Sequence, residues 1–250
     1  MRKFFVLVLS CGLLGAAPAL AQSPFGGSPA SVNAALTKLF GDIKAFSARA
    51  EVKVYGSNQT EKIVAPLEVA LLDNKFRTEV DVTQMRNKDL PPGALDGMKQ
   101  LGMERTISVV RPDKKANYLI FPGAKAYVNL TLPQEELDLY EKSVKVEKSA
   151  LGKETLDGRA CVKHKVLITD PAGRKHEATV WNATDLKDFP VQVLVKEGDD
   201  TVIMRYRDIK LGAPDAKLFE PPAGFKEYSD VQALMQALML KIMSGGGPPQ

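Results

Sequence analysis

Alternation of apolar and polar residues with a period of two is the sequence feature that most restricts the fold. In residues 48–55, ARAEVKVY, alanine and valine alternate with charged residues and a tyrosine, and the pattern returns in residues 76–83, FRTEVDVT. Successive side chains of a strand point to opposite faces, so each segment predicts a strand with one dry and one wet face. One-sided alternation is typical of antiparallel sheets, because strands covered on both faces read as continuous apolar runs.

Further strands follow at close spacing, separated by turn residues such as Asp73-Asn74 and Pro122-Gly123. A single open sheet of about eleven strands twists and curls instead of staying flat. The fold class expected is therefore α+β, with a strongly curved antiparallel sheet, a half β-barrel, covered on its concave side by helices. The additional strands are expected near residues 63–72, 105–111, 116–121, 126–132, 144–149, 160–169, 174–182, 190–197 and 201–209.

Helical periodicity marks the segments expected to cover the concave side. Residues 31–45 carry apolar side chains at spacings of three and four, which predicts an amphipathic helix. Residues 94–103 form a weaker helix, because Gly93, Gly97 and Gly102 flank and interrupt it. A short connecting helix is expected after Pro133.

The strongest helix signals lie near the C-terminus, in residues 229–243. Ser229 and Gln232 form a capping box, and Gly245 is a stop signal. Methionine repacks around ligands of different shape, so a methionine stripe indicates either ordinary core or a movable apolar wall. The stripe consists of Met235, Met239 and Met243.

The first residues have the form of a secretory signal peptide. Arg2 and Lys3 precede an apolar run, and small residues lead to an expected cleavage after Ala21, which predicts a periplasmic protein with a signal peptide of residues 1–21. Lipid attachment at Cys11 is the alternative. The remaining divisions expected are a flexible spacer 22–30, one domain 31–228, the helix 229–243 and a disordered tail 244–250.

Composition excludes several classes of function. The 34 basic and 30 acidic residues give a formal net charge of +4. Cleavage of the signal peptide would remove Arg2 and Lys3 and leave 32 basic against 30 acidic residues, a net charge of +2. This charge is too small to indicate nucleic-acid binding. Cys161 and His164 form a C-x-x-H spacing, but residues three apart on a strand point to opposite faces and cannot chelate one ion without a bulge. Common hydrolase, metalloprotease, P-loop and dinucleotide motifs are absent from the sequence. We therefore expect a protein that is not an enzyme and that binds no metal and no cofactor.

Three segments resemble the LolA/LolB superfamily of bacterial lipoprotein carriers and outer-membrane lipoprotein-sorting proteins. Residues 36–54 are similar to the family's opening helix and first strand, residues 107–127 to its paired strands around a P-x-x-K hairpin, and residues 218–225 to its closing F-x-P-P-x-G motif. The resemblance implies a half-barrel with a hydrophobic inner face that accepts acyl chains without acting on them. The helix 229–243 is additional to the carrier pattern and indicates a separate branch of the superfamily.

These observations predict a non-enzymatic, exported and monomeric protein that binds lipid or acylated lipoprotein. The alternative is a periplasmic sensor or protein-interaction module on the same fold, with an envelope protein as its partner. Acyl chains are expected to contact apolar side chains on the concave face and on its helices. The candidate pocket residues are Leu36, Phe40, Val52, Val54, Val80, Val82, Leu95, Met98, Met235 and Met239.

Overall fold

The computed structural model describes residues 37–141, 144–169, 171, 173 and 175–244. The predicted signal peptide, the spacer and the tail after Ser244 lie outside these residues. The described helices are α2 (Ala94–Gln100), α3 (Gln134–Glu141) and α4 (Val231–Met243), with short 3-10 turns η1 (Val82–Gln84), η2 (Pro112–Lys114) and η3 (Ala216–Phe219). The strands are β1 (Ala45–Tyr55), β2 (Glu61–Leu72), β3 (Lys75–Asp81), β4 (Arg86–Asn87), β5 (Arg105–Arg111), β6 (Ala116–Phe121), β7 (Ala126–Thr131), β8 (Lys145–Leu156), β9 (Arg159–Thr169), β10 (Lys175–Ala183), β11 (Phe189–Glu197), β12 (Asp200–Leu211) and β13 (Lys226–Tyr228).

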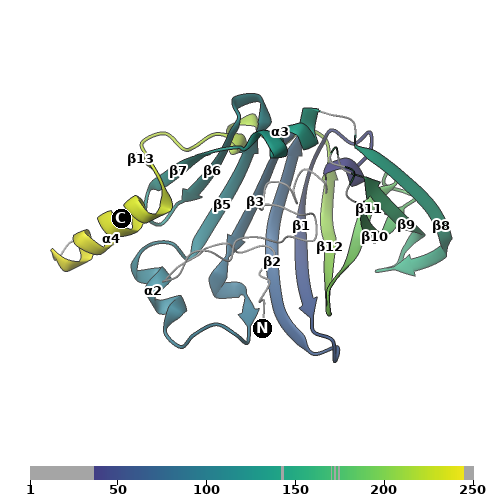
Figure 1. Ribbon diagram of the computed structural model, residues 1–250, viewed down its shortest axis with the longest axis horizontal. Coiled ribbons are helices and arrows are strands. Elements are labelled where there is room, and N and C mark those ends of the chain that lie inside the picture. Colours follow the sequence, from purple (N-terminus) through teal and green to yellow (C-terminus); the bar gives the residue numbers. More distant parts are fainter. Residues whose placement is uncertain (1–36, 142–143, 170, 172, 174, 245–250) are drawn as a thin grey trace.

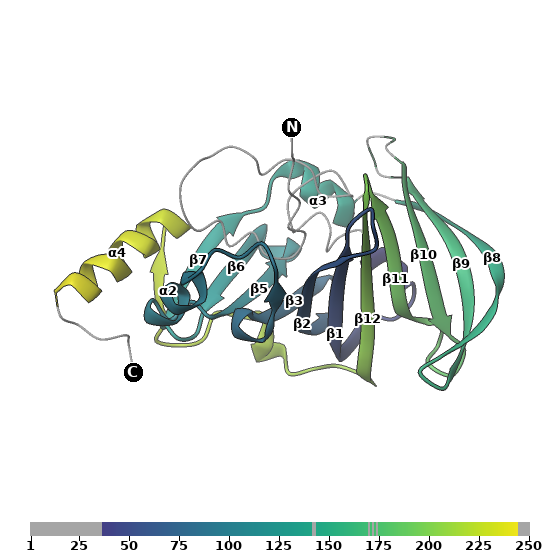
Figure 2. The same cartoon turned by 90° about the horizontal axis from the view of Figure 1, so that it is seen from below.

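The strands form one open sheet, as the alternation predicted. Its order is β13-β7-β6-β5-β3-β2-β1-β12-β11-β10-β9-β8, with β4 paired to β2. Neighbours pair antiparallel, except that the short β13 runs parallel to β7. Figure 1 shows the strands side by side, and Figure 2 shows the sheet as an arc whose two ends stay apart. The expected half-barrel is confirmed, with thirteen strands in the described part of the chain.

The expected helix 31–45 ends earlier than its periodicity indicated. Its residues up to 36 lie outside the described part; residues 37–39 are helical and residues 40–42 form a turn. Gly41 has a φ of 58°, the left-handed conformation that commonly ends a helix. β1 then begins at Ala45, opposite Leu72 of β2. The prediction of helix up to Ala45 was wrong because sheet pairing captures its last residues.

Packing of α3 identifies the inner face of the arc. Val110 of β5 is buried against Leu137 and Tyr140 of α3, and α3 lies inside the arc (Figure 2). Val110 pairs with Phe76 of β3, so the two side chains share a face. This face is called the inner face below, and the opposite one the outer face.

The outer face of β2, β5 and β6 is covered by the segment between β12 and β13. Phe219 of η3 is fully buried there, among a second apolar cluster that includes Val109 and Tyr118. Arg111 holds this segment in place: its guanidinium donates to the carbonyl of Phe219 at 3.0 Å and to the carboxylates of Glu220 and Asp113. The closing motif of residues 218–225 therefore covers the outer face of the half-barrel.

Arg111→Met is expected to lower the free energy of unfolding by about 2 kcal/mol. The Arg111 side chain is only 7% exposed, so its loss leaves the buried Phe219 carbonyl without this hydrogen-bond donor. The carboxylates of Asp113 and Glu220 are about half exposed, so loss of their ion pairs costs less than loss of a fully buried pair. In a chain of this size, the melting temperature should fall by roughly 4–8 °C, measured by calorimetry. Arg86→Met is the matched control and should change stability by less than about 0.5 kcal/mol, because the Arg86 side chain is 71% exposed beside Glu61.

Acid should reduce the difference between Arg111→Met and the wild type, and should leave the part that comes from the Phe219 carbonyl. Hydrogen bonds from Arg111 lower the pKa of Asp113. Burial acts to raise the pKa of Glu220, but hydrogen bonds from Lys114 and Arg111 outweigh it and lower this pKa too. A carboxylate with a lowered folded pKa stabilises above its unfolded pKa, about 4, and loses this effect as the pH falls through the folded pKa. An undiminished difference in melting temperature at acid pH would contradict this role of Arg111.

Helix α4 packs on the inner face at the β7 end of the sheet. Leu234 and Leu238 lie against a cluster that includes Phe121 and Val128. The helix is capped by Asp230, whose carboxylate accepts from the amide of Ala233 at 2.7 Å. The predicted capping box at Ser229 was wrong by one residue, because a carboxylate at the next position caps the helix instead.

Candidate functional site

Apolar side chains line the inner face of the three central strands. Every second residue of β1 and β2 belongs to one buried cluster, and the series continues into β3 with Phe76 and Val80. This inner-face cluster consequently follows from the period-two alternation. Its members on the three strands are Phe46, Ala48, Ala50, Val52, Val54, Ile63, Ala65, Leu67, Val69, Leu71, Phe76 and Val80.

The same cluster continues over the neighbouring strands β9 to β12. Val52 of β1 pairs with Met204 of β12, which in turn pairs with Val193 of β11. Buried valines and isoleucine extend the surface toward the end of the arc, at Val166, Ile168, Val180, Val191, Val193, Val195 and Val202. The inner face thus presents hydrocarbon and thioether groups across several adjacent strands.

Four aromatic rings close one end of the inner-face cluster. The centroid of Phe40 lies 4.6 Å from that of Phe46 and 5.2 Å from that of Phe189. The ring of Tyr206 meets Phe189 edge-on at 5.5 Å, and its hydroxyl donates to the sulfur of Met204 at 2.9 Å. Burial raises the pKa of Tyr206 well above its ordinary value, so the hydroxyl stays neutral. These four packed rings are called the aromatic wall below.

Polar groups on β9 and β10 satisfy one another. His164 Nδ1 lies 3.0 Å from Asn182 Oδ1, and Asn182 Nδ2 donates to the carbonyl of Asp188 at 2.6 Å. The second bond orients the amide, so its oxygen accepts from Nδ1–H of His164. Burial raises the pKa of the Cys161 thiol. Among the residues that the structure describes, no group of three or more His, Cys, Asp and Glu side chains could hold a metal ion.

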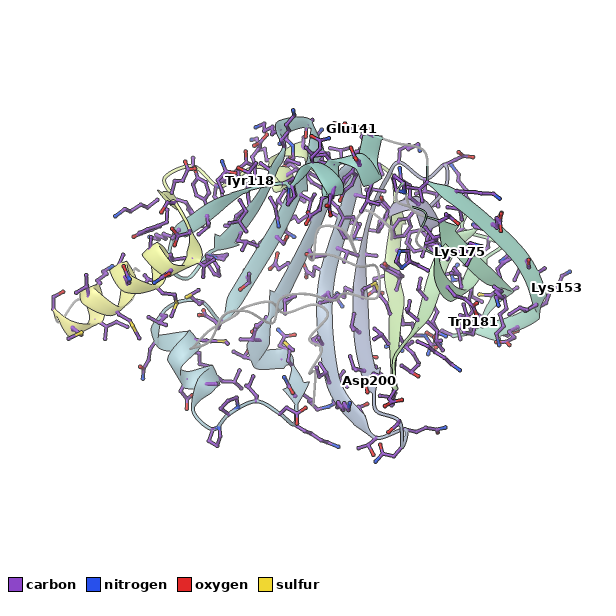
Figure 3. All side chains as sticks on the ribbon, viewed as in Figure 1. Tyr118, Glu141, Lys153, Lys175, Trp181 and Asp200 are labelled. Atoms are coloured by element: carbon purple, nitrogen blue, oxygen red, sulfur yellow. The ribbon has the colours of Figure 1, made fainter. Side chains whose placement is uncertain are left out.

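A polar trio fixes the far end of the sheet. The indole N–H of Trp181 donates to Glu154 of β8 at 2.7 Å. The Nζ atom of Lys163 in β9 lies 2.9 Å from Oε1 of Glu154 and 4.9 Å from the centroid of the Trp181 ring. Figure 3 places Trp181 at this end of the molecule, opposite α4. The trio ties β8, the long edge strand, to β9 and β10.

Seven of the ten candidate pocket residues come together in the inner-face cluster. Of the other three, Leu36 lies outside the described residues, Met235 packs against the cluster of α4, β6 and β7, and Met239 is 48% exposed. The role of all ten residues in ligand binding stays a prediction. The seven are Phe40, Val52, Val54, Val80, Val82 and Met98, which are buried, and Leu95, which packs against them.

Sequence reasoning missed three rings of the aromatic wall. Phe46 continues the alternation of residues 48–54 backwards by one step, but the expected helix up to Ala45 obscured this continuity. Phe189 opens β11 after an irregular pairing between β10 and β11. Tyr206 lies in a strand predicted correctly, and its distance in sequence from Phe40 hid their contact.

Helix α2 is a short cover at one margin of the inner-face cluster. Met98 is its one buried residue, 8% exposed, and Leu95 packs against the same cluster. Gly93 before the helix and Gly102 after it both have positive φ angles, 78° and 67°. A seven-residue helix with one buried residue belongs to the less stable parts of a fold.

Comparison with solved structures gives several matches at low identity. A LolA superfamily protein from Nitrosomonas europaea is 9% identical over 73% of this chain and 93% of its own, with a TM-score of 0.36. The lipoprotein LppX from Mycobacterium tuberculosis is 15% identical over 73% and 97%, with a TM-score of 0.40. A putative outer membrane lipoprotein-sorting protein domain from Vibrio parahaemolyticus is 11% identical over 76% and 95%, with a TM-score of 0.30. At these values the matches say nothing about ligand or activity.

Comparison with sequences adds no relative: no protein-family model and no curated protein matches this chain. The half-barrel agrees with the fold that the LolA-like segments of the sequence implied. In the described part of the chain, no helix combines the length and apolar character needed to cross a bilayer.

Proposed function

We propose that this protein is an exported, non-enzymatic binding protein that holds the acyl chains of lipids or lipoproteins on the inner face of its half-barrel. The observation that carries the proposal is the inner-face cluster, which is continuous and apolar across several adjacent strands. The LolA-like segments of the sequence support the same ligand class. The predicted signal peptide supports a periplasmic location, and we propose a monomer that acts in transport of envelope lipid or lipoprotein.

Burial of methylenes supplies the driving force. Each buried methylene contributes about 0.8 kcal/mol, so a chain of about fifteen contributes roughly 12 kcal/mol. Association and ordering cost about 4–15 kcal/mol, so a long acyl chain binds only if most of its length is buried. A chain of half that length contributes too little. The protein should therefore favour long acyl chains over short ones.

Access to the inner face requires a covering segment to move. Side chains such as Val52 and Val80 are buried within the folded protein. Helix α2 is the segment best suited to move, because it is short and contacts the cluster through only Met98 and Leu95. In this proposal α2 opens, an acyl chain replaces its contacts, and α2 closes over the bound chain.

A protein-interaction module on the same fold is the second candidate. Strand β8 (Lys145–Leu156) ends the sheet, so one of its two edges has no partner strand in the described part of the chain. Nearly all of its side chains are exposed. An exposed edge can pair with a strand of another protein, although lysines and an irregular pairing at Gly152 blunt this edge.

Native mass spectrometry distinguishes the two candidates. The protein would be purified from an exporting bacterial host and weighed before and after organic extraction, and the extract would be analysed for lipids. Acyl binding predicts a near-stoichiometric added mass that extraction removes and that palmitate restores better than octanoate. An unmodified mass that takes up neither palmitate nor phospholipid would overturn acyl binding and favour the interaction module.

A further inference from the structure

The outer half of α4 carries a concentration of exposed apolar side chains. In its first half, Leu234 and Leu238 are buried on the inner face of β6 and β7. Of the six large apolar side chains exposed in the described residues, four lie in the last five residues of this helix. They are Met239 (48% exposed), Leu240 (67%), Ile242 (40%) and Met243 (83%).

These side chains are exposed because the helix extends past the sheet. Both views show α4 projecting beyond the edge formed by β7 and β13 (Figures 1 and 2). The buried positions recur every four residues, Leu234 then Leu238, and the next in the series, Ile242, is 40% exposed. The apolar pattern thus continues for one turn after its packing surface has ended.

The exposed apolar side chains form one broad face of the helix, opposite Lys241. Successive residues are rotated by about 100°, so residues 242, 239, 243 and 240 span an arc of about 160°, and Lys241 lies on the other side of the helix. A protein groove buries a narrower stripe of a helix, whereas a broad apolar face opposite a basic residue is typical of a helix that lies in the surface of a bilayer. A second copy of this chain is also a poor fit, because a stable interface takes about 20–30 residues a side.

The charge and apolar face of this tip suit the surface of an anionic bilayer. Lys241 is the only charged residue between Val231 and Met243, and the capping carboxylate of Asp230 lies at the opposite end of the helix. An interfacial helix buries its apolar face about 5–10 Å into the headgroup and acyl boundary, and residues 239–243 offer four large apolar side chains for this. A single lysine favours anionic headgroups.

We propose that residues 239–243 are a docking tip that inserts into the surface of an anionic bilayer. This inference rests on the proposed function and deepens it, because it names a membrane as the place where acyl chains are collected or delivered. The buried half of α4 packs on the inner face, through Leu234 and Leu238. One helix thus connects the membrane surface to the face that holds the acyl chain.

Vesicle flotation tests the docking tip. The exported protein is expected to float with vesicles of phosphatidylethanolamine and phosphatidylglycerol, and less with phosphatidylcholine alone. Leu240→Ser with Met243→Ser should weaken this binding at least about tenfold, because two of the exposed apolar groups are removed. Leu151→Ser with Leu218→Ser is the matched control: it removes two apolar side chains that are exposed elsewhere, 56% and 41%, and should float like the wild type.

Two results would overturn the docking tip: a wild type that does not float with anionic vesicles, or equal flotation of the wild type and the Leu240/Met243 variant. Sedimentation velocity identifies the alternative occupant. If the wild type does not float but forms a dimer, and the Leu240/Met243 variant is a monomer, the tip binds a second copy of the chain.

Uptake of dispersed palmitate without vesicles keeps the docking tip and the proposed acyl binding distinguishable. It should be unchanged in the variant, and a wild type that floats but takes up no palmitate removes acyl binding while the docking tip stands.

Discussion

Gly102→Ala is expected to lower the free energy of unfolding by about 3 kcal/mol, a larger loss than Arg111→Met should cause. Gly102 has a φ of 67°, where an alanine is strained. An added Cβ would also lie 2.5 Å from the backbone carbon of Gly123, in the hairpin between β6 and β7. Backbone atoms cannot give way as a flexible side chain can, so the loop after α2 must separate from the hairpin. Chemical denaturation measures the loss.

Two glycine substitutions separate close approach from conformational strain. Gly123→Ala would place its Cβ 2.7 Å from the carbonyl oxygen of Gly102, yet Gly123 has no positive φ, so it tests the contact alone. Gly97→Ala is the matched control inside α2, where an added Cβ meets nothing within 4 Å. It should be neutral or stabilise by up to about 1 kcal/mol. If Gly102→Ala were as stable as Gly97→Ala, the close packing of loop and hairpin would be wrong.

The strands were predictable wherever one face is buried. The expected bounds of residues 105–111 and 116–121 agree with β5 and β6. β8 was expected over residues 144–149 but runs to Leu156, because this exposed edge strand lacks the apolar alternation that marks a buried face. The two-residue β4 and the three-residue β13 are too short to carry a pattern, and tertiary pairing forms them.

The sequence predicted which residues of the candidate site share a face of the sheet, but not which distant segments pack together there. Alternation placed Val52, Val54 and Val80 on one face, and the structure gathers them in one cluster. The helical spacing of apolar residues could not show that α4 packs at the β7 end of the sheet, where Met235 joins a separate cluster. Position along the sheet depends on strand order, which local sequence does not encode. The same limit hid the aromatic wall, whose rings come from distant segments.

Met98→Asp is expected to reduce uptake of palmitate at least about tenfold. Met98 is the buried contact of α2 with the inner-face cluster, and a carboxylate there either ionises in an apolar surface or keeps α2 from closing. A tenfold change corresponds to about 1.4 kcal/mol, less than the cost of placing an unpaired carboxylate against buried hydrocarbon. Palmitate binding would be measured by isothermal calorimetry, with circular dichroism to verify that the strands remain folded.

Gln100→Asp is the matched control for Met98→Asp, because it places the same charge on the same helix at an exposed position. Its palmitate affinity should stay within about twofold of the wild type, since an exposed carboxylate contacts water and not the inner face. Met98→Leu should also bind normally, because it preserves an apolar contact of similar volume. Full palmitate uptake by Met98→Asp would remove α2 as the cover of the site. Loss of uptake in both aspartate variants would instead show that α2 acts through its overall charge or stability, independent of the contact that Met98 makes.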